Sequence, residues 1–148
     1  MQRSAVLIVG LLCIVLAACV APPVVSPSER GDGVVVAEAW ARAAATGNSA
    51  AYMILRNQGA VADRLIRAEC DAAAAVELHQ TSMEGGMMKM APVDGIVVPA
   101  RGQVELKPGG LHVMLIGLKR ELKAGEKLLL KLYFEQGGVR EIMAEVRQ

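Results

Sequence analysis

Apolar and β-branched residues recur along the chain in short runs that are separated by turn-forming residues. Within several runs apolar and polar positions alternate with a period of two, which is typical of strands with one buried face. No segment sustains a helical period. The segments that we predict as strands are Val34–Ala39, Ala51–Leu55, Arg64–Ala68, Ala75–His79, Gly95–Pro99, Gln103–Leu106, Leu111–Gly117, Lys127–Glu135 and Val139–Val146.

Two alanine-rich segments, Glu38–Ala45 and Asp71–Ala75, could be helical by propensity alone. We interpret both as irregular or single-turn connections between strands. Residues 34–148 then form one all-β domain, a Greek-key β-sandwich. Periodicity alone leaves an immunoglobulin-like and a cupredoxin-like topology open.

The first residues have the composition of a secretion signal. Arg3 supplies a positive start, and Ala5–Ala18 is an apolar run shorter than the roughly 20 residues of a membrane-spanning helix. The sequence Leu16-Ala17-Ala18-Cys19 resembles a bacterial lipobox, which implies a signal peptide over residues 1–18 and lipid attachment to Cys19. An ordinary signal peptide cut nearby and an uncleaved anchor helix are the alternatives.

Residues 19–33 are rich in Pro, Ser and Gly, which is typical of a flexible linker. The lipobox and this linker together predict an extracytoplasmic domain that a lipid tethers to a membrane, in the periplasm or at the cell surface. All three readings of the leader place the domain outside the cytoplasm.

Composition excludes several classes of function. Lys and Arg number 16 against 15 Asp and Glu, and aromatic residues are 3%, so we expect no nucleic-acid partner. The three cysteines contain no Cys-x-x-Cys, which excludes a disulfide framework and a cysteine-based zinc site. Cys13 leaves with the signal and Cys19 is predicted to be lipidated, so Cys70 remains as a small buried thiol. Nothing resembles a nucleophile–base pair or a phosphate-binding loop, and we predict that the protein is not an enzyme.

The chain has only two histidines, and both fall in predicted strands. Side chains alternate between the two faces of a strand, so His112 and Met114 share the face opposite to Val113, about 7 Å apart. By the same alternation His79 points outward beside Glu77. We therefore predict that neither histidine is a buried core residue.

Four of the eight methionines, Met83, Met87, Met88 and Met90, surround the Gly85-Gly86 pair. The segment is predicted to be a loop or a hairpin tip, where apolar side chains are unusual. Thioether sulfur suits Cu(I), and imidazole is also acceptable to copper. A methionine-rich partner surface or a loop folded over the core would explain the same residues. A blue-copper centre is not expected, because it needs a thiolate near the histidine and methionine ligands.

The series His79, ten residues, Met90, twenty-one residues, His112-x-Met114 resembles the signature of the periplasmic copper chaperone family PCu(A)C. The resemblance extends over most of residues 34–146. Segments that look like family sequence include Ala39-Trp40-Ala41-Arg42, Ala51-Tyr52-Met53, Glu77-Leu78-His79, Met83-Glu84-Gly85-Gly86 and Leu106-Lys107-Pro108-Gly109-Gly110.

This resemblance implies a cupredoxin-like sandwich that binds one Cu(I) per monomer through His79, Met90, His112 and Met114. It also implies copper delivery to the copper A centre of cytochrome c oxidase, with the oxidase subunit and Sco-type thiol proteins as partners. The remaining methionines, Met83, Met87 and Met88, lie outside the signature and would surround the ligands or pass copper on.

Two other functions stay open. One is a metal-free, lipid-tethered binding or assembly module that uses the methionine-rich loop as a contact surface. The other is a copper scavenging or resistance protein with the same site.

Overall fold

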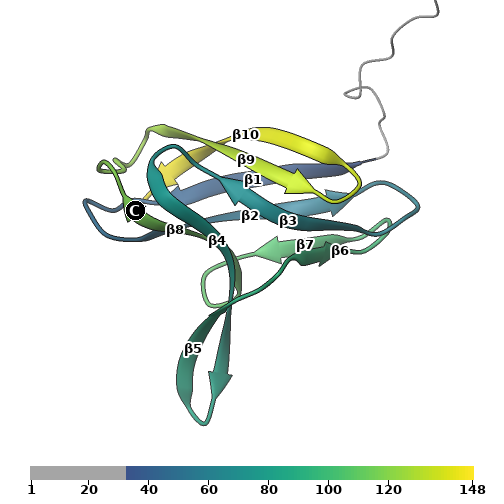
Figure 1. Cartoon of the computed structure of the whole chain (residues 1–148), viewed down its shortest axis with the longest axis horizontal. Helices are drawn as coiled ribbons and strands as arrows, with labels where there is room; N and C mark the ends of the chain where they lie inside the picture. Colours follow the sequence, from purple (N-terminus) through teal and green to yellow (C-terminus); the bar gives the residue numbers. More distant parts are fainter. Residues whose placement is uncertain (1–32) are drawn as a thin grey trace, which may run out of the picture.

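The computed structural model describes residues 33–148, and these form ten strands joined by short turns (Figure 1). The predicted signal peptide, Cys19 and nearly all of the predicted linker lie outside the described residues. Over the described range, no helix is long and apolar enough to cross a membrane. The strands are β1 (Val34–Arg42), β2 (Ser49–Asn57), β3 (Asp63–Glu69), β4 (Ala73–Glu84), β5 (Met87–Pro92), β6 (Ile96–Val98), β7 (Gln103–Leu106), β8 (Leu111–Leu118), β9 (Lys127–Phe134) and β10 (Gly138–Arg147).

Strand pairing follows the order β5-β4-β8-β2-β1-β10-β9-β3-β6, and β7 pairs with β2 beside this path. Strand β1 joins the two halves, because it is antiparallel to β2 and parallel to β10. Strand β2 pairs with β8 along its first residues and with β7 along its last. The predicted all-β sandwich is confirmed.

Buried aliphatic side chains from both halves form one core. Leu55, Val113 and Leu115 come from β2 and β8, and Leu65 and Leu130 come from β3 and β9. Each such side chain contributes roughly 1.5–3 kcal/mol when it is fully removed from water. This shared core holds β8 in a fixed position against β2.

Neither alanine-rich segment is helical, and the irregular connection predicted over Glu38–Ala45 is wrong as far as Arg42, because these residues are strand. Strand β1 continues to Arg42, with a bulge where Glu38 takes a φ of 52° and the pairing with β2 shifts by one residue. The bulge places Trp40 opposite Tyr52. The second segment is a turn at Asp71 and Ala72 that leads directly into β4.

The methionine-rich segment is a hairpin, and most of it is strand rather than loop. Strand β4 continues past His79 to Glu84, and β5 returns antiparallel to it. The two residues of the turn, Gly85 and Gly86, have φ of 58° and 80°, as a type I′ turn requires. The outer part of this hairpin projects from the body of the domain (Figure 1).

We expect the double substitution Gly85→Ala with Gly86→Ala to loosen the hairpin. A left-handed backbone costs alanine roughly 1–2 kcal/mol per residue, so the two substitutions together cost roughly 2–4 kcal/mol. Exchange of the Met87 and Lys89 amides, which face β4 in this antiparallel ladder, should therefore accelerate by about thirtyfold or more. Hydrogen exchange measures this directly. Gly85→Asn is the control, because asparagine tolerates this backbone. Unchanged exchange in the double variant would contradict the turn geometry.

Candidate metal centre

The pairing of β4 with β8 brings the two histidines together. His79 lies directly opposite His112, and Glu77 lies opposite Met114. The centroids of the two imidazole rings are 5.7 Å apart. Residues directly opposite each other in an antiparallel pair share a face of the sheet, so these four side chains lie on one face.

The other face of the same strands is the core, as the alternation predicts. Val113 and Leu115 are fully buried, and Leu78 is nearly so. His112 lies on the face opposite to this core, as predicted, but it is only 4% exposed, so the expectation that it is not buried is wrong. The side chain of His79 is 13% exposed.

Aromatic rings on the outer face explain the burial of His112. The ring of Tyr52 on β2 lies 6.3 Å from the imidazole of His112, between centroids. Trp40 on β1 packs against Tyr52 in turn, at 4.5 Å. Rings from β1 and β2 therefore shield the imidazole of His112 from water. Local alternation cannot show this cover, because the rings come from other strands.

The tautomer of His112 is set by a backbone carbonyl. Its Nδ1 lies 3.0 Å from the carbonyl oxygen of Gly110, so Nδ1 carries a proton and donates it. The same oxygen accepts the backbone N–H of Thr81 at 3.1 Å. In the neutral ring Nε2 is then left with a free lone pair.

In His79 the other ring nitrogen, Nε2, makes the hydrogen bond. Its Nε2 lies 2.8 Å from Oε2 of Glu77, so the proton sits on Nε2. Its Nδ1 is buried and has no hydrogen-bond partner within residues 33–148. A buried polar atom without a partner is costly, and a metal ion would satisfy this one. A carboxylate on the second nitrogen also strengthens an imidazole as a ligand.

The sequence places Glu77 beside His79, but their hydrogen bond was not predicted. The signal was present, because two residues that are two positions apart in a strand share a face. The position of Trp40 and Tyr52 beside His112 depends on long-range strand pairing, so the local sequence pattern does not predict it.

Met90 lies on the same face as the histidines. It pairs with Thr81, which is two positions beyond His79 on β4. The other methionines of the hairpin divide between its faces. Met83 and Met88 oppose each other on the histidine face, whereas Met87 opposes Glu84 on the reverse face. The structure thus gathers His79, Met90, His112 and Met114 on one face, at spacings of about 7 Å along each strand.

Within residues 33–148, no three His, Cys, Asp or Glu side chains lie together so that they could hold a metal ion. The side chains that share the histidine face include the thioethers of Met90 and Met114. Such a donor set is soft and carries no thiolate.

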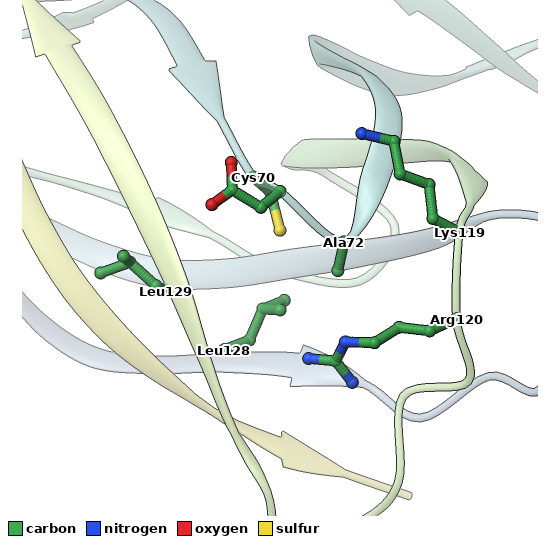
Figure 2. A pocket seen from close by; sticks show the side chains of 7 residues that line it. Cys70, Ala72, Lys119, Arg120, Leu128 and Leu129 are labelled. Atoms are coloured by element: carbon green, nitrogen blue, oxygen red, sulfur yellow. The ribbon is translucent and has the colours of Figure 1, made fainter.

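Cys70 is too far away to join this donor set. It lines a separate cavity of about 260 Å³, together with Ala72, Lys119 and Arg120 (Figure 2). From Ala73, at the start of β4, to His79 is roughly 20 Å of strand. Burial also raises the pKa of the Cys70 thiol, which keeps it protonated. Cys70 is the buried thiol that the sequence predicts.

We expect the metal-free protein at neutral pH to hold its two histidines in different tautomers. His79 should carry its proton on Nε2 and His112 on Nδ1, because Glu77 and the Gly110 carbonyl accept these protons. Long-range ¹H–¹⁵N spectra distinguish the two forms. Glu77→Ala should release His79 into a mixture of tautomers and leave His112 unchanged. A proton on Nδ1 of His79 in the native protein would contradict this geometry.

Comparison with known proteins identifies the family to which the chain belongs. Residues 34–146 match the protein family described as "Putative lipoprotein LpqE-like". A protein named as a putative lipoprotein, from Leifsonia xyli subsp. xyli, is 35% identical over 123 residues, which cover 82% of this chain and 74% of that protein. An uncharacterized protein from Rickettsia prowazekii is 31% identical over 121 residues, covering 73% of this chain and 67% of the relative.

Solved structures with a similar fold include PCuAC domains. The copper-bound PCuAC domain from PmoF2 has a TM-score of 0.66 and 26% identity, covering 77% of this chain and 92% of that chain. The solution structure of the Cu(I) form of DR1885, from Deinococcus radiodurans, has a TM-score of 0.62 and 35% identity, covering 79% of this chain and 81% of that one. The family match and these likenesses show that the chain belongs to the LpqE-like lipoprotein family and that its domain is of the PCu(A)C type.

Proposed function

We propose that this protein is an extracytoplasmic copper carrier that binds one Cu(I). Its ligands are Nδ1 of His79, Nε2 of His112 and the sulfurs of Met90 and Met114. The observation that carries the proposal is the buried, unpartnered Nδ1 of His79, which lies on the same face as the second imidazole and the thioethers. The copper-bound state of similar solved domains supports the same conclusion.

The donor set favours Cu(I) over harder metal ions. Thioether sulfur and neutral imidazole are soft or intermediate ligands, whereas Ca²⁺ and Mg²⁺ need oxygen ligands. All four ligands are neutral, and the carboxylate of Glu77 lies beside them, where it favours a cation. The site has no thiolate, so a thiolate-bearing acceptor can take the copper from it. These properties suit a carrier rather than an enzyme.

Delivery to the copper A centre of cytochrome c oxidase is the role that we propose for this carrier, with Sco-type thiol proteins in the same pathway. The lipobox-like sequence that ends at Cys19 supports a lipid anchor, as does the putative lipoprotein from Leifsonia xyli. A tether through residues 19–33 would keep the domain near membrane-bound clients. A copper scavenger with the same site is the other candidate function. The two functions differ in whether the protein passes its copper to a client protein.

An anaerobic Cu(I) titration of the full-length protein in detergent, against a competing chelator, tests the ligand set. We expect one tight equivalent in the native protein. His112→Ala and Met114→Leu should each weaken it by at least about tenfold, since changes even to residues that only orient a ligand cost that much. Met143→Leu is the matched control, because Met143 is exposed on β10 away from the site.

Absence of a tight equivalent, or binding that is indifferent to both substitutions, would overturn the ligand set. The metal-free binding or assembly module would then be the better account. In that case the methionines of the hairpin would matter for function and the histidines would not.

Deletion of the gene should lower cytochrome c oxidase activity in cells that grow on limiting copper, and added copper should restore it. The native protein should complement the deletion, and the Met114→Leu variant should not, because weakened binding removes the cargo. Oxidase activity and copper tolerance are measured side by side. Normal oxidase activity together with lowered copper tolerance would favour the scavenger and contradict delivery.

A further inference from the structure

The β4–β5 hairpin has two chemically different faces. Its reverse face carries an ion pair, in which Nζ of Lys89 donates to Oε2 of Glu84 at 2.9 Å, and Met87 lies on this face. The face that continues from the histidines carries Met83, Met88 and Met90 instead. The hairpin therefore presents a row of thioethers on the histidine side only.

Met83 and Met88 form a directly opposed pair near the tip of this row. Their Cβ atoms are about 5 Å apart in such a pair, and both side chains are long enough for the two sulfurs to meet at one ion. Each residue is 67% exposed, so the pair is open to solvent and to an incoming donor or acceptor of copper. Methionine is usually buried, so this exposure calls for an explanation.

The pair lies in line with the proposed centre. Met90 is two positions from Met88 along β5, and its partner Thr81 is two positions from both Met83 and His79 along β4. Each step is roughly 7 Å, a distance that flexible methionine side chains can shorten from both ends. Met90 is itself 58% exposed and stands between the pair and the imidazoles.

We propose that Met83 and Met88 form a second, weaker Cu(I) site at the hairpin tip, through which copper enters and leaves the centre at His79 and His112. The ion moves by exchange of one thioether for another, with Met90 as the shared ligand, and its oxidation state does not change. Two thioethers without an imidazole bind more weakly than the full centre and favour only soft ions. This inference rests on the proposed function.

The test compares Met83→Leu/Met88→Leu with Met87→Leu in the full-length protein, under the anaerobic Cu(I) titration described above. All three residues are exposed, so leucine should leave the core and the hairpin intact. The native protein and Met87→Leu should take up a weak second equivalent after the tight one, with shifts of the Met83 and Met88 methyl signals in ¹H–¹³C spectra wherever those residues are present. The double variant should lose the second equivalent, keep the first, and release the first several-fold more slowly to an added chelator.

The two proposals fail in different ways. A native protein that binds one tight equivalent and no second, or a double variant that keeps the second equivalent, would overturn the hairpin site alone. Equal release rates in the double variant and Met87→Leu would overturn its role as the route. Absence of the tight equivalent in every protein would overturn the proposed function itself.

Discussion

The pairing register between β4 and β8 is the constraint on which the site depends. It sets His79 opposite His112 and Glu77 opposite Met114. A slip of one residue would turn the imidazole of one strand into the core and an aliphatic side chain of that strand out of it. Burial of Leu78, Val113 and Leu115 on the reverse face opposes such a slip. The same hydrophobic burial that stabilises the sandwich therefore also aligns the histidines.

A single carbonyl oxygen connects this register to the chemistry of the ligands. The oxygen of Gly110 accepts the backbone N–H of Thr81 and Nδ1–H of His112. It thereby ties the turn before β8 to β4 and determines which nitrogen of His112 is free. With Glu77 acting on His79, each imidazole has one nitrogen occupied by the protein and one available. The rings are thus oriented before any metal arrives, which reduces the entropy that binding must overcome.

Much of the fold could be predicted from local patterns, because alternation and turn residues mark strands in the sequence. The same alternation correctly predicted that the side chain of Val113 points to the face opposite to His112 and Met114. The predicted strand Ala75–His79 was shorter than β4, which continues to Glu84. Residues 82–84 are exposed on both faces, so no alternation of apolar and polar residues marks them as strand. The burial of His112 could not be foreseen from its own strand, because Tyr52 and Trp40 cover it from two others.

Local patterns did not predict which residues lie opposite each other on neighbouring strands. The bulge at Glu38 aligns Trp40 with Tyr52, and no glycine or proline in the local sequence predicts it. The division of the hairpin methionines needs the pairing of β4 with β5, which no spacing along one strand shows. The resemblance to PCu(A)C supplied four candidate residues, and the structure adds the physical reason why they share a face.

X-ray absorption at the copper K-edge of the Cu(I)-loaded protein tests the central claim most directly, because it identifies the atoms bound to the metal. The account predicts a spectrum of Cu(I) with both sulfur and imidazole nitrogen as nearest neighbours, and a lower nitrogen contribution after His112→Ala. A copper ion surrounded by nitrogen and oxygen alone, or by sulfur alone, would contradict it.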